Sequence, residues 1–258
     1  MANSMAIMNL EVVLKKLFSI SCLVAVGAIL MAVQSGCSQP AAVSYLTKID
    51  HSRSASKADP KKDAPTRVDA GTAWSIDRYG RSVQRYANRY DLDWRLVLAV
   101  MKRESRFSPE AVSHKGAYGL MQIMPLTQQE LAGKLGVNDL QTPLNNIRAG
   151  TFHLWSLYQA FDQADDENRI KLTLAAYNAG LNRILDAQDV GVYLGDDPND
   201  WESVRAALPL LSRRYSTLHG RIWQSGKPRA GYFSDWRQTQ AYVDTIVSYY
   251  DEYQLALK

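Results

Sequence analysis

Residues 97–125 read VLAVMKRESRFSPEAVSHKGAYGLMQIMP and join an apolar helical stripe to a loop rich in glycine, small and amide residues. The helix is expected to end before Ser108-Pro109, because a proline disfavours helix in the residue before it. Glu104 lies near that end, on the apolar face. The i, i+3, i+4, i+7 spacing of that face is occupied by Val97, Val100, Met101 and Glu104.

A carboxyl group on an apolar face beside such a loop has the pattern of a tuned acid in a cleft. Burial disfavours the charged form, so we expect the pKa of Glu104 to be raised and the group to hold a proton near neutral pH. The alternative is a glutamate that caps the helix end or pairs with Lys102 or Arg103. Spacing alone leaves both interpretations open, since structural ion pairs also perturb pKa values.

The rest of the body of the chain has helical patterns. Asp93 is a good N-cap, Thr127 and Glu130 form a capping box, and Gly136 and Gly180 end helices. No segment has sustained strand alternation, so the sequence predicts an all-α globular domain. Helices are expected over about 75–90, 93–104, 127–136, 143–161, 170–179 and 239–253.

Residues 181–236 have a less regular pattern and are expected to form a long loop region. Loops of this length are usually functional or disordered, and the aromatic content argues against disorder. The aromatic side chains either stack on sugar faces in a groove or form a small satellite core, and the sequence favours neither. They are Tyr215, Trp223, Tyr232, Phe233 and Trp236.

The N-terminus has the composition of an export signal. Two lysines, Lys15 and Lys16, precede the uncharged apolar run 17–33, which is borderline in length for a spanning helix. We predict a lipoprotein-type signal peptide over residues 1–36, with Met5 or Met8 as a possible true start. A flexible tether over 37–72, rich in serine, alanine, lysine and proline, then leads to a catalytic domain over 73–258.

The two cysteines refine this prediction. Cys22 lies inside the apolar run and Cys37 directly after it, so cleavage before Cys37 leaves one cysteine at the new N-terminus. That arrangement resembles a bacterial lipoprotein acylated on Cys37, although Gln34 stands where such signals usually have leucine. Ser38 after the cysteine favours the outer membrane. An uncleaved anchor or a plain signal peptide is the alternative, and each places the body of the protein outside the cytoplasm.

Several classes of chemistry lack their motifs. There is no H-E-x-x-H zinc motif, no G-x-S-x-G nucleophile and no phosphate-binding glycine loop, and His114 is a lone loop histidine. We therefore expect no metal and no cofactor. The net charge of +4 is mild and no basic block indicates a nucleic-acid partner.

A single protonated carboxyl group in an aromatic, amide-lined cleft suits cleavage of a glycosidic bond. Most glycosidases use a second carboxylate, but the nearest candidate, Glu110, lies in a loop near the surface. A mechanism with Glu104 alone requires the substrate to supply its own nucleophile.

Four segments, in the expected order, resemble the soluble lytic transglycosylase (SLT) domain family. The insert around Asp200-Trp201 and Leu208-Pro209-Leu210-Leu211 most resembles the membrane-bound lytic transglycosylase F group of that family. The four segments are Glu104-Ser105-Arg106-Phe107 with Gly119-Leu120-Met121-Gln122-Ile123-Met124-Pro125, then Asn146-Ile147-Arg148-Ala149-Gly150, Ala176-Tyr177-Asn178-Ala179-Gly180, and Arg237-Gln238-Thr239-Gln240-Ala241-Tyr242-Val243.

The resemblance implies a goose-lysozyme-like fold. It also implies cleavage of peptidoglycan strands between N-acetylmuramic acid and N-acetylglucosamine, with Glu104 acting as acid and then as base while an anhydro ring closes. Gln238 departs from the family, which often has glutamate there. The implied substrate-binding residues are Ser113 and Gln122 beside the acid and the N-acetyl group, Gly119 and Met121 on the floor, and Tyr177, Asn178 and Tyr242 along the cleft.

Two other functions compete with this prediction. One is a hydrolase that uses water, and the other is a catalytically silent peptidoglycan-binding lipoprotein, which the presence of Glu104 disfavours. The partners we expect are peptidoglycan glycan strands and a membrane, held through the N-terminal lipid or signal anchor, with the protein itself a monomer.

Overall fold

The structure, a computed structural model, describes residues 68–257 and is helical through most of that range. The all-α prediction is confirmed for this part of the chain. Its β-type backbone pairing is limited to isolated bridges within residues 112–123. None of its helices is both long and apolar enough to cross a membrane. The elements are α2 (Ala70–Arg89), α3 (Trp94–Ser105), α4 (Pro125–Leu135), α5 (Pro143–Tyr158), η1 (Gln159–Phe161), α6 (Asp166–Ala179), α7 (Leu181–Leu194), α8 (Trp201–Ala207), η2 (Leu208–Leu211), η3 (Arg213–Tyr215), α9 (Ser216–Ile222) and α10 (Trp236–Ala256).

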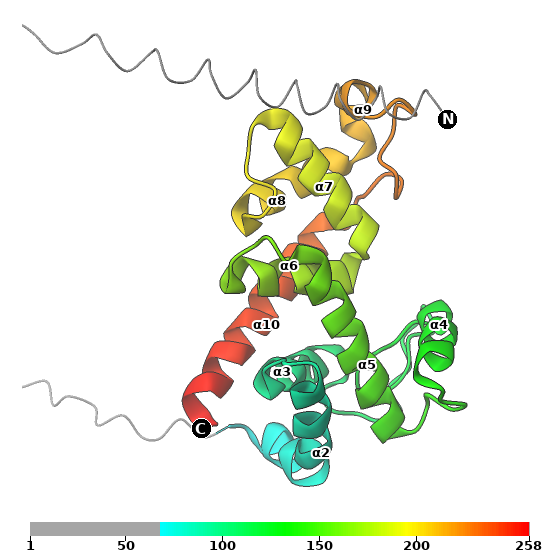
Figure 1. Cartoon of the computed structure of the whole chain (residues 1–258), viewed down its shortest axis with the longest axis vertical. Helices are drawn as coiled ribbons and strands as arrows, with labels where there is room; N and C mark the ends of the chain where they lie inside the picture. The colour runs from blue at the N-terminus through cyan, green and yellow to red at the C-terminus, as the bar shows by residue number, and fades with distance from the viewer. Residues whose placement is uncertain (1–67, 258) are drawn as a thin grey trace, which may run out of the picture. The chain divides into compact units, whose positions relative to one another are not determined.

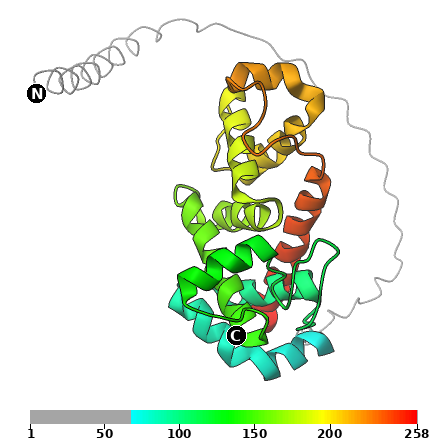
Figure 2. The same cartoon turned by 90° about the vertical axis from the view of Figure 1, so that its right-hand side faces the viewer.

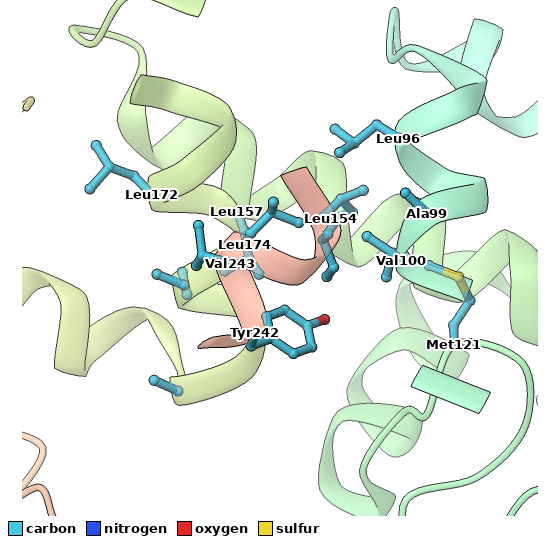
Figure 3. Packing of buried hydrophobic residues seen from close by; sticks show 14 of the residues in the cluster. Leu96, Ala99, Val100, Met121, Leu154, Leu157, Leu172, Leu174, Tyr242 and Val243 are labelled. Carbon is cyan, nitrogen blue, oxygen red and sulfur yellow. The ribbon is translucent and has the colours of Figure 1, made fainter. Parts of the chain in front are cut away.

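The helices surround one core, within which α6 packs against α5, α7, α8 and α10. Helix α10 packs against α3 and α6, while α2 packs against α3 and α5. Figures 1 and 2 show α7, α8 and α9 grouped at one end of α6 and α10, away from α2 to α5. Full burial of each large aliphatic side chain contributes about 1.5–3 kcal/mol. The buried core side chains labelled in Figure 3 include Leu96, Val100, Leu154, Leu157, Leu172, Leu174, Tyr242 and Val243.

Helix α2 begins earlier than the sequence predicts. It starts at Ala70 rather than near residue 75, with Asp69 as N-cap accepting a hydrogen bond from the Thr72 backbone N–H at 3.1 Å. The Thr72 hydroxyl also lies 2.9 Å from the hydroxyl of Tyr253, which anchors the helix start to α10. The folded part therefore starts within the range 37–72 predicted as a tether. The predicted signal peptide and Cys37 lie outside the described residues.

The predicted start of α4 is wrong, while two other boundaries are confirmed. The helix begins at Pro125 after Met124 as N-cap, not at the Thr127 capping box, because proline suits the first helical position, where an N–H would have no partner. Gly136 ends α4 in the left-handed conformation, as predicted. Asp93 caps α3 by accepting from the Arg95 backbone N–H at 2.9 Å.

The expected long loop over 181–236 is also wrong, because most of it is helical. The fully buried Trp201 begins α8, and Trp223 and Phe233 are buried with it in the core. Trp223 and Phe233 pack in the protein interior, as the satellite-core interpretation predicted, whereas Tyr232 is 42% exposed. Helix α7 follows Gly180 directly and has no side-chain N-cap, so the usual sequence signal for its start is absent.

A buried carboxylate attaches the segment before α10 to α7. Asp186 is fully buried and accepts hydrogen bonds from the backbone N–H groups of Arg229 and Ala230, at 3.2 and 2.8 Å. The Arg229 guanidinium lies 3.3 Å from the same carboxylate and also bonds Asp189. Each contact to Asp186 comes from an N–H donor, so this site requires a group that only accepts.

We expect Asp186→Asn to lower the free energy of unfolding by about 2 kcal/mol, because its amide group places a donor against buried donors. Urea denaturation followed by circular dichroism measures this. Asp77→Asn, at an exposed position of α2, is the matched control and should change stability little. Equal stabilities of the two variants would contradict the role of Asp186.

Candidate active site

The last turn of α3 and the first half of α10 bring Glu104 and Tyr242 together. The Tyr242 hydroxyl donates a hydrogen bond of 2.5 Å to Oε1 of Glu104. Tyr242 is 1% exposed, and Figure 3 shows its hydroxyl pointing from α10 toward the side on which α3 and Met121 lie. The Arg103 guanidinium lies 5.3 Å from the centre of the Tyr242 ring. These contacts hold the carboxyl group in one position.

The surroundings of Glu104 favour its protonated form. Burial raises its pKa from an ordinary 4.5 to about 7, against the hydrogen bond from Tyr242 and the charge of Arg103, which both lower it. Within residues 68–257 no other carboxylate contributes to this shift. Lys102, the alternative partner, instead pairs with Asp69 at 2.7 Å. Glu104 thus has the environment of the tuned acid that its position on the apolar face predicts.

Tyr177 of α6 lies next to this pair. Burial and the charge of Glu104 raise the pKa of Tyr177 well above 10, and the same causes act on Tyr242. The Tyr177 hydroxyl donates to the backbone carbonyl of Met121 at 2.8 Å, which attaches α6 to the loop after α3. Both tyrosines therefore stay neutral hydrogen-bond donors near the acid.

The loop between α3 and α4 is held together by its own side chains. Gln122, in the left-handed conformation, donates from Nε2 to the carbonyls of Ala111 and Gly119, each at 2.9 Å. The Ser113 hydroxyl oxygen accepts from the Ala117 backbone N–H at 2.9 Å. Both side chains brace the loop, and their contact with an N-acetyl group stays a prediction.

Asn146, at the start of α5, organises the floor of the loop. It is fully buried, accepts from the Met121 backbone N–H at 2.8 Å and donates to the Tyr118 carbonyl at 3.0 Å. Gly119, with φ of 80°, faces this amide, and a Cβ there would lie 2.7 Å from Asn146 atoms. No local pattern predicts this role of Asn146, because Met121 and Tyr118 lie more than 20 residues away in the chain.

We expect Gly119→Ala to destabilise the protein by about 3 kcal/mol, since the added methyl group overlaps Asn146 and alanine is strained at positive φ. A thermal denaturation series measures the change. Gly133→Ala in α4 has nothing within 4 Å of the new Cβ and should leave stability unchanged or raised. A Gly119→Ala protein as stable as wild type would refute the close packing.

Asn178 lies between two hollows at the end of α6. Its Oδ1 accepts from the Thr239 hydroxyl at 2.9 Å. One cavity, of about 480 Å³, is lined by Asn178, Tyr177 and His153 among others. The other, of about 180 Å³, is lined by Asn178 and Gln238 with other residues. The two cavities thus have Asn178 in common, with Tyr177 lining the larger one and Gln238 the smaller one.

Sequence reasoning missed three further residues of these cavities. The His153 ring centre lies 5.3 Å from that of Tyr177, and burial lowers the pKa of His153. Lys115 and Arg183 line the smaller cavity, together with the acidic residue Asp235. A histidine or lysine alone in a helix or loop carries no sequence signal for such a position. Residues 68–257 contain no group of three or more side chains placed to hold a metal ion.

Residues 81–191 match the family described as "Transglycosylase SLT domain". The membrane-bound lytic murein transglycosylase F of Desulfosudis oleivorans is 34% identical over 180 residues, which cover 68% of this chain and 36% of that protein. The protein of the same name from Pasteurella multocida is 36% identical over 162 residues, covering 62% and 32%. The crystal structure of the 70 kDa soluble lytic transglycosylase of Escherichia coli superposes with a TM-score of 0.48 and 24% identity, over 68% of this chain and 24% of that one.

The matched region contains Glu104, the loop that follows it, Tyr177 and Asn178, while Tyr242 lies beyond its end. The chain spans about a third of the length of the two transglycosylase F relatives described above. Through residues 81–191, the chain belongs to the transglycosylase SLT domain family.

Proposed function

We propose that this chain is a peptidoglycan lytic transglycosylase that cleaves the bond between N-acetylmuramic acid and N-acetylglucosamine. The observation that carries the proposal is Glu104, a carboxyl group with a pKa of about 7 that is fixed by Tyr242 and has no second carboxylate acting on it within residues 68–257. The names of the relatives, membrane-bound lytic murein transglycosylases, support the same activity.

The proposed reaction needs no water. Protonated Glu104 gives its proton to the glycosidic oxygen as the bond from that oxygen to C1 of the muramyl residue breaks. The carboxylate then takes the proton of the muramyl C6 hydroxyl while O6 bonds to C1 and closes the 1,6-anhydro ring. Glu104 ends protonated as it began, and intramolecular attack by O6 is effective because the nucleophile is already in place.

Other side chains hold the reacting groups. Tyr242 is a positioning residue, since it donates to the carboxylate of Glu104 and lowers its pKa. Ser113 and Gln122 are assigned to the N-acetyl group on the family resemblance, and Tyr177 and Asn178 to the cleft wall. The cavities beside Asn178 support that last assignment.

We infer that the protein works at the cell envelope, facing the periplasm. The relatives named membrane-bound support this location, and an acylated Cys37 or an uncleaved N-terminal anchor is the proposed attachment, with the outer membrane favoured. Cells labelled with a radioactive fatty acid test the first option. Cys37→Ala protein should carry no label, and a labelled variant would refute acylation at that residue.

Digestion of purified sacculi tests the activity. After borohydride treatment, anhydro ends stay unreduced because they have no free aldehyde, whereas hydrolytic ends gain two hydrogens. We expect the released fragments to carry unreduced anhydro ends. Reduced muramic acid ends in their place would identify a hydrolase, the competing enzyme.

A further inference from the structure

A basic cavity lies at the end of α3, the helix that carries Glu104, and Glu104 itself is not among the residues that line it. It has a volume of about 660 Å³ and is formed where the start of α2, the end of α3 and the second half of α10 meet. Its cations all come from the end of α3 and the residue after it, and Phe107 and Tyr249 are its aromatic residues. The lining includes Lys102, Arg103, Arg106, Asp69, Phe107 and Tyr249.

The charges of this cavity do not balance. Lys102 is paired with Asp69 at 2.7 Å and lies 4.3 Å from the centre of the Tyr249 ring. Arg103 and Arg106 form no ion pair with any carboxylate among residues 68–257. Both guanidinium groups therefore have donors available to an anion from outside the domain, while the charge of Arg103 also acts on Glu104. A planar guanidinium group can bind a carboxylate through two parallel N–H···O hydrogen bonds.

We propose that this cavity binds the carboxylates of the peptide stems of peptidoglycan. The inference rests on the proposed function and adds a substrate feature to it. The stems carry the carboxylates that match Arg103 and Arg106, while Phe107 and Tyr249 offer apolar surface to the alkyl parts of a stem. The cavity therefore selects strands that bear peptides over stripped glycan.

Arg103 connects this cavity to the chemistry. Its guanidinium lies over the Tyr242 ring, and the Tyr242 hydroxyl holds Glu104. A stem bound at Arg103 thus brings a peptide-bearing muramyl residue close to the acid. Arg106 is exposed and takes no part in the Tyr242–Glu104 hydrogen bond or in the pKa shift of Glu104, so it allows the cavity to be tested apart from the catalytic pair.

Binding measurements on the full chain carrying Glu104→Gln, which is not expected to cleave its ligands, test the proposal. The probes are soluble glycan strands with their stems, the same strands stripped by an amidase, and free stem peptide. We expect the stem-bearing strands to bind about fivefold tighter than stripped ones, the gain typical of two partly exposed charge pairs. Free peptide should bind weakly.

Adding Arg106→Gln should remove most of this preference and leave the affinity for stripped strands within about twofold, since only exposed charge contacts are lost. Adding Arg85→Gln, the same charge change at an exposed position of α2, should leave the preference intact. The proposed site is contradicted if the Arg103→Gln/Arg106→Gln protein still prefers stem-bearing strands. It is also contradicted if the Glu104→Gln protein has no such preference. If the Glu104→Gln protein binds neither the stem-bearing nor the stripped strands, this result contradicts the proposed function, and the site with it.

Discussion

Glu104→Gln is expected to reduce the digestion of sacculi by at least about 1,000-fold, because the amide neither donates the proton to the glycosidic oxygen nor accepts one from the C6 hydroxyl. The size of Glu104 and an acceptor for Tyr242 are kept, so the fold should be unchanged. Release of dye from labelled sacculi measures the rate. The matched control is Glu110→Gln in the loop after α3, which is exposed and should keep full activity.

Stability provides a second readout on the same variant. The raised pKa of Glu104 means that the wild-type fold loses stability as the pH rises from about 4.5 to about 7, where the unfolded chain ionises and the folded group holds its proton. Above that window the cost is constant. Glu104→Gln protein should therefore be the more stable of the two at pH 8 and equal to wild type near pH 4. An inactive variant that is less stable at both pH values would indicate misfolding instead.

Tyr242→Phe is expected to have the second largest effect. The hydroxyl lowers the pKa of Glu104 by hydrogen bonding to its charged form, so its loss raises that pKa above 7. Because the first step requires protonated Glu104, wild-type activity should fall as the pH rises through about 7. The variant's falling limb should lie about one pH unit higher, with activity at the optimum reduced about tenfold.

Full pH profiles of kcat/KM separate this positioning role from simple packing. A packing defect lowers activity at all pH values without moving the limb, whereas loss of the hydrogen bond moves it. Tyr86→Phe, a partly buried tyrosine of α2, is the control and should leave both the limb and the maximum unchanged. If the falling limb of the Tyr242→Phe pH profile lies at the same pH as in wild type, the proposed link between Tyr242 and Glu104 is contradicted.

Local periodicity was sufficient to predict the helix that carries the acid. Val97, Val100 and Met101 are fully buried, and Asp93 caps their helix as expected. The buried face on which Glu104 follows them also accounts for its raised pKa. Spacing on a helix face is a local property, so it is readable without knowledge of the fold.

Features that depend on distant partners were not readable in this way. Thr72 extends α2 through a contact with Tyr253, 181 residues later, and Asn146 holds a loop more than 20 residues before it. The helices of 181–236 were missed because α7 follows a glycine without a capping side chain, while α8 and α9 span only seven residues each. In each case tertiary contacts decide the conformation.

The most direct test of the central claim is digestion of sacculi in water labelled with ¹⁸O, with mass spectrometry of the new muramic acid ends. Glu104 acting first as acid and then as base predicts anhydro ends that contain no ¹⁸O and are lighter by one water than hydrolytic ends. Muramic acid ends that carry one ¹⁸O at C1 would show that water is the nucleophile and would contradict the account.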